Sequence, residues 1–240
     1  MINPTKLANN STQMHSELRK MDKLMRQANN EYPRISPYRV NMRAGQMNLT
    51  QRFIDWINKI GQVVDQERDK TSYLPFWEII KQSTKATKQN RLGDCAESSS
   101  IMMSSLLANG YKDGKIARLL FEAEARDLAT DKVVGRKMLD TTHEFVVRNL
   151  DSGYTPNNPK TYGKNLIVID AWEGFCSNFQ EAVKKYYDSF LGGMREWINS
   201  DANLKITYKP RFHICEFSQA TEDEVKIFQK EFPELIIQNT

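Results

Sequence analysis

The hydrophobic pattern of the chain changes at Gly93, and this change constrains the fold more than any other feature of the sequence. Before Gly93, apolar residues recur at helical spacing in three segments, which begin near Ser11, Leu49 and Leu74. After it, a helix over residues 94–109 is followed by extended segments over residues 115–125, 142–150, 165–172 and 204–217. Helices followed by mostly antiparallel strands are typical of an α+β fold.

The segments between these elements carry the usual signals of turns and short helices. Residues 31–46 hold Pro33, Pro37 and Gly45 and are expected to form a connector, and the polar residues 81–91 a solvated turn. Residues 151–164 are rich in Gly, Pro and Asn, which predicts a long loop. Residues 165–172 are apolar on both faces, which favours a central strand, and two further helices are expected over 179–190 and 222–232.

Composition excludes several classes of protein. The 240 residues include 40% apolar and 27% charged side chains, which is ordinary for a globular chain. A balance of 34 Lys and Arg against 30 Asp and Glu, without a recognition motif, argues against a nucleic-acid partner. The apolar stretches are too short for a membrane span, and the N-terminus has no hydrophobic stretch typical of a signal peptide.

The cysteines and histidines are too few and too scattered for a structural framework. Cys95, Cys176 and Cys215 are an odd number without a C-x-x-C pair, so neither a disulfide scaffold nor a zinc site is expected. We therefore expect reduced thiols in a cytosol-like compartment and no metal or organic cofactor. In such a compartment a single well-placed Cys is a candidate nucleophile.

Three residues in the second part of the chain have the types and contexts of a catalytic triad. Cys95 is expected at the first position of a helix, where unpaired backbone N–H groups and the helix dipole favour a thiolate. His143 lies on a strand, on the same face as Phe145. Asp170 ends the most apolar strand, where its carboxylate needs a partner, and an imidazole would be one. In such a set the imidazole takes the thiol proton and the carboxylate orients the imidazole.

The segments around these residues resemble a known family. Gly93-Asp94-Cys95-Ala96-Glu97, Thr142-His143-Glu144-Phe145-Val146-Val147 and Val168-Ile169-Asp170-Ala171-Trp172 look like the three core motifs of the transglutaminase-like branch of papain-fold enzymes. That branch includes transglutaminases, peptidases and bacterial effector glutamine deamidases. The resemblance covers about residues 88–175 and departs from the common pattern at Ala96 and Ala171, where the family often has Gly and Pro.

The resemblance implies a papain/transglutaminase-like core, in which the helix that bears Cys95 packs on an antiparallel sheet. We expect this catalytic core over residues 88–240, with a helical region over residues 1–87 packed on it. The implied activity is acyl transfer on a protein substrate, at a peptide bond or a Gln side chain, as a thiol protease, deamidase or transglutaminase. The alternative is a catalytically silent protein-binding module on the same scaffold.

Two further residues complete the expected site. Gln89 lies six residues before Cys95, as a Gln often does in papain-like proteases, and is a candidate oxyanion donor beside the backbone N–H of Cys95. Trp172 is a candidate wall of the site, or otherwise a core aromatic residue. His213 and Cys215 form a rival pair, but a Cys on a strand lacks the activation of a helix start.

The C-terminal region suggests a destination. The acidic cluster Glu222-Asp223-Glu224 and the apolar patch Leu235-Ile236-Ile237 resemble the translocation signals of effectors exported by bacterial type IV secretion. This resemblance implies export to a host cell without a cleaved signal peptide, and a host protein as target. The alternative is the acid-rich first turn of a helix, which is commonplace.

Overall fold

The computed structural model describes residues 4–37, 51–194 and 204–237, and it is an α+β fold. The helices are α1 (Pro4–Glu31), α3 (Gln51–Thr71), α4 (Phe76–Asn90), α5 (Cys95–Ala108), α6 (Phe179–Met194) and α7 (Glu222–Glu231). The strands are β1 (Lys115–Asp127), β2 (Val133–Arg148), β3 (Ile167–Asp170), β4 (Phe175–Asn178) and β5 (Leu204–Ile214). None of the described helices is both long enough and apolar enough to cross a bilayer.

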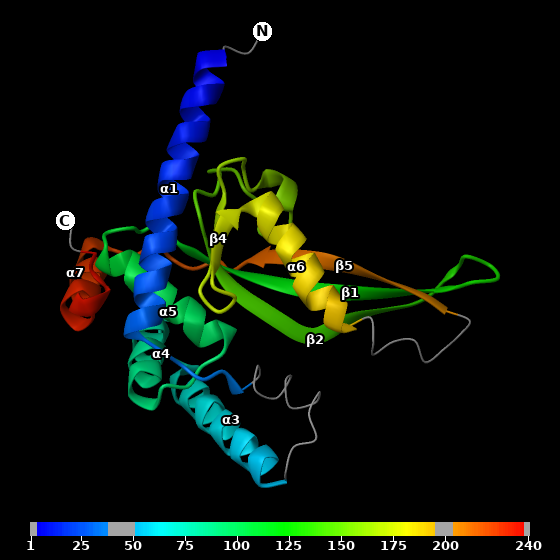
Figure 1. Cartoon of the computed structure of the whole chain (residues 1–240), viewed down its shortest axis with the longest axis horizontal. Coiled ribbons are helices and arrows are strands. Elements are labelled where there is room, and N and C mark those ends of the chain that lie inside the picture. The colour runs from blue at the N-terminus through cyan, green and yellow to red at the C-terminus, as the bar shows by residue number, and fades with distance from the viewer. Residues whose placement is uncertain (1–3, 38–50, 195–203, 238–240) are drawn as a thin grey trace.

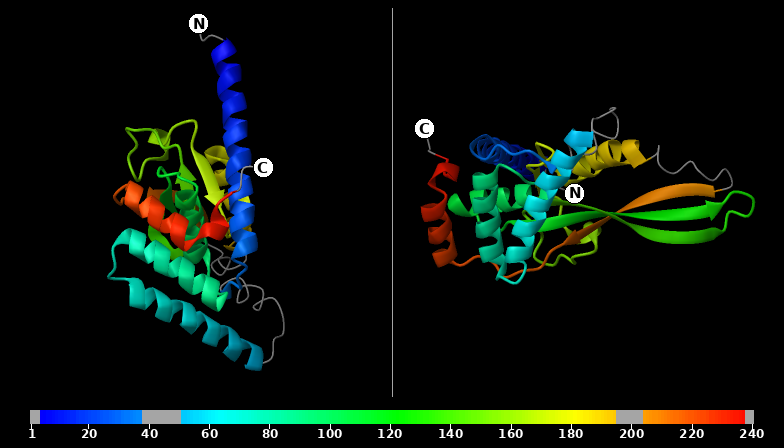
Figure 2. Two further views of the ribbon diagram at one scale, coloured as in Figure 1. Left: turned by 90° about the vertical axis from the view of Figure 1, so that its left-hand side faces the viewer. Right: turned by 90° about the horizontal axis from the view of Figure 1, so that it is seen from below.

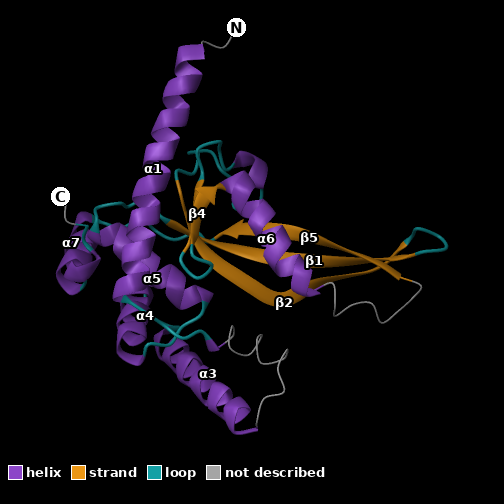
Figure 3. Ribbon diagram, in the orientation of Figure 1, coloured by secondary structure: helices purple, strands orange, loops and turns teal. Residues whose placement is uncertain are grey.

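The five strands form one antiparallel sheet in the order β4-β3-β2-β1-β5. Three of them, β1, β2 and β5, continue as a long twisted ribbon that projects away from α1, α4, α5 and α7 (Figure 1 and Figure 2). The helix α6 lies along this ribbon, as Figure 3 also shows. The molecule thus has a helical end, and the sheet extends away from this end as the ribbon.

Each face of the sheet is covered by its own core. On one face, α5 packs between the sheet and the helices α1, α4 and α7, with Met21, Ile101 and Val146 among the fully buried residues. On the other face, Phe145 and Leu119 pack against Tyr186 of α6. Residues 94–109 were expected to form a helix ended by Gly110, and α5 confirms this, with Gly110 at φ +80°.

Several expectations are wrong in detail. Residues 81–90 are not a turn but the second half of α4, because Thr84 and Thr87 turn their hydroxyls back onto the carbonyls of Ile80 and Ser83 and are buried. The boundary expected between residues 87 and 88 therefore falls inside this helix.

The extended segments also differ from expectation. β2 begins at Val133, well before the expected residue 142, and residues 133–138 are exposed, with Val134 and Met138 among them. β3 is an interior strand, as expected, because it pairs with β2 on one side and with the unexpected strand β4 on the other. The helix α6 continues beyond the expected residue 190 to Met194, and residues 38–46 of the expected connector lie outside the described residues.

Candidate functional site

The first turn of α5 presents Cys95 and is held from two sides. Glu97 accepts a hydrogen bond from the Asp94 backbone N–H at 2.8 Å, which forms the capping box expected from the sequence. The Arg68 guanidinium of α3 donates two hydrogen bonds of 2.7 Å to the same carboxylate. Gly93 passes so close that a Cβ there would lie 2.6 Å from the Cβ of Glu97. Cys95 is half-buried in this position.

His143 faces the α6 side of the sheet, together with Phe145, whereas α5 packs on the opposite side against Val146. Cys95 of α5 and His143 of β2 can approach each other although they start from opposite sides of the sheet, because β3 pairs with β2 only over Val146–Arg148. At His143, β2 therefore has no β3 neighbour. Cys95 lies near enough to this imidazole for the two side chains to interact.

Asp170, the last residue of β3, is fully buried and is surrounded by hydrogen-bond donors. Its Oδ2 lies 2.5 Å from Nε2 of His143 and accepts a hydrogen bond of 2.7 Å from the Tyr186 hydroxyl. Its Oδ1 accepts hydrogen bonds from the backbone N–H groups of Trp172 and Glu173, at 3.1 and 2.8 Å. Four donors thus fix the carboxylate that the sequence indicated would need a partner.

The environment of His143 favours the imidazolium. Burial lowers the pKa of the imidazole, but the charge of Asp170, the hydrogen bond to it and the interaction with Cys95 raise that pKa to about 10. With Nε2 directed at Asp170, Nδ1 is the ring nitrogen left for the Cys95 thiol. The arrangement pairs a proton-carrying imidazole with a buried carboxylate, and Cys95 lies near the ring.

Trp172 covers the imidazole, as a wall of the site would. Its ring lies 5.2 Å from the His143 ring, and its indole N–H donates to the Ser36 hydroxyl at 3.2 Å. Ser36 donates in turn to the Asp94 carboxylate at 2.5 Å. This chain of contacts connects Trp172 to the cap of α5, so Trp172 and the start of the helix that bears Cys95 are positioned together.

Gln89 is not brought to the site. It lies in the last turn of α4 with an exposed side chain, and no hydrogen bond found among the described residues connects it to Cys95 or His143. This position gives no support to its expected role as an oxyanion donor. The sequence spacing misled because α4 extends to Asn90, which turns residue 89 into part of a solvated helix face.

The rival pair does not form a dyad either. His213 is half-buried, and its Nδ1 hydrogen-bonds with Asn157 Oδ1 at 2.7 Å. Cys215 follows the end of β5, and burial raises the pKa of its thiol. Cys176 is similar, because burial raises its thiol pKa to about 12.

Tyr186 belongs to the site but was not expected from the sequence. It is buried on α6, four residues after buried Ala182, and burial and the Asp170 charge raise the pKa of its phenol well above the usual value. The spacing of Ala182 and Tyr186 indicates only a buried helix face. Nothing in it identifies Asp170 as the partner.

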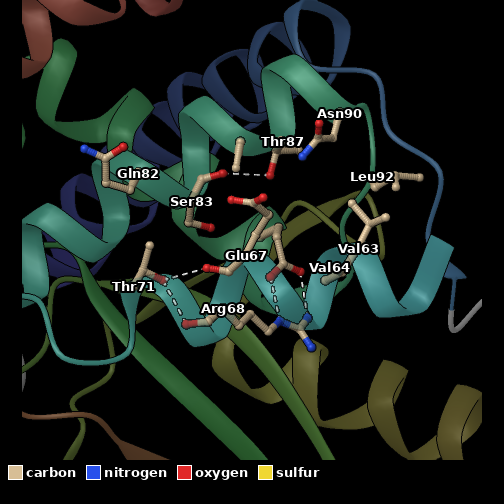
Figure 4. A pocket seen from close by; sticks show the side chains of 12 residues that line it. Val63, Val64, Glu67, Arg68, Thr71, Gln82, Ser83, Thr87, Asn90 and Leu92 are labelled. Carbon is tan, nitrogen blue, oxygen red and sulfur yellow. Dashed lines mark hydrogen bonds and ion pairs between the residues drawn. The ribbon is translucent and has the colours of Figure 1, made fainter. Parts of the chain in front are cut away.

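A narrow pocket lies between α3 and α4, behind the first turn of α5 (Figure 4). Its walls include Val63, Val64 and Thr87, and Glu97 lines it together with Arg68. None of the site residues expected from the sequence lines this pocket. Among the described residues, no group of three or more His, Cys, Asp or Glu is arranged to hold a metal ion.

The acidic and apolar segments near the C-terminus are both part of the folded structure. Glu222, Asp223 and Glu224 form the first turn of α7, which Thr221 caps, and Leu235 is fully buried. This packing agrees with the structural alternative, a helix start rich in acids, and leaves export as a proposal.

Comparison with known proteins adds no identification. No protein-family model matches the chain, and neither a curated protein nor a solved structure matches it.

Proposed function

We propose that the chain is a cysteine-dependent enzyme that transfers or hydrolyses the acyl group of a protein amide, with Cys95 as nucleophile, His143 as base and acid, and Asp170 as the orienting carboxylate. The observation that carries the proposal is the imidazole of His143, which is bound through Nε2 to a buried carboxylate and lies near enough to Cys95 for the two side chains to interact. A helix that presents the Cys and packs on an antiparallel sheet also supports a papain/transglutaminase-like core.

The chemistry follows from the positions of the protons. In the reactive form the proton of the Cys95 thiol already resides on His143, which is therefore an imidazolium, and the thiolate attacks the carbonyl carbon of the amide. The carbon–nitrogen bond of the amide then breaks, and His143 returns its proton to the leaving nitrogen. The result is a thioester on Cys95. The backbone N–H of Cys95, at the start of α5, is the candidate donor to the oxyanion.

The acceptor of the thioester decides the class of enzyme. Water releases an acid, so a peptide bond is cut or a Gln side chain is deamidated, whereas an amine forms a crosslink. Trp172 shields the imidazole and is placed to restrict water on one side. Within this proposal the substrate is a protein, and a host protein is its target if the C-terminal segment directs export.

Product analysis tests the proposal. Protein extract from cultured cells is incubated with the wild type, with Cys95→Ala and with the matched control Cys215→Ala, and peptides are compared by mass spectrometry. We expect new N-termini, Gln-to-Glu conversions or Gln–Lys crosslinks with the wild type and with Cys215→Ala, and none with Cys95→Ala. Equal products from the wild type and Cys95→Ala would favour the silent binding module.

A further inference from the structure

One face of the projecting ribbon is strongly charged, and it is the face that continues from α5. The strand register places Arg118, Glu122 and Glu124 of β1 on this face, because they alternate with the apolar residues that pack toward α6. The paired positions on the neighbouring strands add further cations. Among the described side chains, the cations of this face are Arg118, Arg126, Arg136, Lys205, Lys209 and Arg211, and the carboxylates are Glu122, Glu124 and Glu144.

The carboxylates lie deep and the cations lie outside. Glu124 is 2% exposed and is surrounded by Arg126, Arg136 and Lys209, of which Arg136 and Lys209 are 59% and 50% exposed. Hydrogen bonds from these cations lower the pKa of the Glu124 carboxyl to about 2, against the opposing effect of burial. Solvent therefore meets guanidinium and ammonium groups, and the acids serve to hold them in place.

The same arrangement repeats toward the site. Arg211 is 57% exposed above Glu122, which is 16% exposed, and Arg118 is 50% exposed beside Glu144, which is 15% exposed. Glu144 directly follows His143 along β2. Arg118 is near enough to Cys95 for the two to interact electrostatically. The cationic face thus extends from the tip of the ribbon to the edge of the candidate site.

We propose that this cationic face is a docking surface for an acidic segment of the protein substrate, which it positions with an amide at Cys95. The inference rests on the proposed function and adds the chemistry of substrate recognition. Its support is the charge of the face, its rigid hydrogen-bonded cations and its continuity with the site. A protein segment is favoured over nucleic acid because the proposed reaction acts on a protein amide, and because the balance of 34 Lys and Arg against 30 Asp and Glu, without a recognition motif, argues against a nucleic-acid partner.

The test measures binding of a fluorescein-labelled, Glu-rich peptide by fluorescence anisotropy at about 50 mM and about 0.5 M NaCl, since salt screens exposed charges. We expect wild-type binding that weakens at the higher salt. The variant Arg136→Gln/Lys209→Gln should bind about five-fold more weakly at low salt, because each exposed ion pair contributes little alone. The matched control Lys70→Gln/Lys226→Gln, which also removes two exposed cations, should bind like the wild type.

A second variant guards against misfolding. In Arg136→Gln/Lys209→Gln the buried Glu124 carboxylate keeps only Arg126 as a partner, which could destabilise the fold. The variant Glu124→Gln/Arg136→Gln/Lys209→Gln is therefore measured as well, because it removes the buried negative charge together with the two cations. We expect the same weakened binding in this variant.

Several outcomes would overturn the docking surface: no peptide binding by the wild type, equal binding by the ribbon variants and the control, or tighter binding of a labelled single-stranded oligonucleotide or of phosphatidylserine vesicles. Alkylation of Cys95 on the same samples reports on the proposed function separately, because it needs no docking partner.

Discussion

Asp170 is the residue on which the geometry of the site depends. Its four hydrogen bonds leave the carboxylate one orientation, and that orientation directs Oδ2 at His143. The chemical sense of the arrangement is that a fixed negative charge holds the imidazole ring and stabilises its protonated form. The consequences can be measured at His143 itself.

Replacing Asp170 should change the titration of His143. In the wild type the pKa of His143 is about 10, whereas Asp170→Asn removes the main charge that opposes the effect of burial, so the pKa should fall. NMR titration of histidine-labelled protein measures this, with the signals of His15 and His213 as internal references. Similar titration of His143 in both proteins would contradict the account.

The same proton affects stability. Folding raises the pKa of His143, so its contribution is complete below about pH 6.5 and is lost as the pH rises toward about 10. The free energy of unfolding should fall across this window in the wild type. Urea denaturation of His143→Gln should show no such fall.

Tyr186 is expected to act as a support of Asp170. Tyr186→Phe removes the hydrogen bond to Oδ2 inside the core and should lower the free energy of unfolding by about 1–2 kcal/mol. The neighbour Tyr187 gives a matched control, since its hydroxyl donates to Tyr208 O at an exposed position. If Tyr187→Phe lowers the free energy of unfolding in urea as much as Tyr186→Phe does, the buried position of the bond between Tyr186 and Asp170 does not account for its contribution to stability.

At the scale of elements, the start of α5 depends on the close passage of Gly93 over Glu97. In Gly93→Ala the new Cβ would meet Glu97, disturb its grip on Arg68 and cost about 2 kcal/mol of stability. Gly135→Ala, in β2, is the control, because a Cβ there meets nothing within 4 Å. Thermal unfolding compares the two, and an equal small effect would show that the first turn tolerates displacement.

The elements differ in how well the sequence predicted them. The spacing of Asp94 and Glu97 and the stop at Gly110 predicted α5 because the signals are local. The second half of α4 was not predicted because its sequence is polar and lacks an apolar face. Thr84 is buried there by a hydrogen bond to Ser104, which forms only in the tertiary structure. The early part of β2 was missed because the ribbon is solvated and lacks a strong apolar alternation.

The candidate site was predictable to a similar degree. Residue types and contexts suggested Cys95, His143 and Asp170 as a set, and the contact that the structure shows within this set is the one between His143 and Asp170. Tyr186 was beyond reach because only the packing of α6 brings it to Asp170. Gln89 misled because spacing along the chain ignores the helix in which it lies.

At the scale of the whole molecule, the N-terminal helices and the sheet share one core. Leu24 of α1 is buried with Ile101 of α5 and Ile169 of β3 in the same cluster. Leu24→Ala should therefore destabilise the whole molecule by about 3 kcal/mol, with coincident transitions in tryptophan fluorescence and circular dichroism. The exposed Leu128 is the control, since Leu128→Ala should cost little. Unfolding of the helices before the sheet would instead show two separate units.

The central claim is that His143 activates the thiol of Cys95, and the most direct test is the rate of iodoacetamide alkylation of each cysteine as a function of pH, read by peptide mass spectrometry. Cys176 and Cys215 are internal controls, because burial raises the pKa of both thiols. We expect Cys95 to react well below neutral pH in the wild type, and this reactivity to be lost in His143→Gln while the controls stay unreactive. A Cys95 that reacts only at alkaline pH, or equally in His143→Gln, would contradict the account.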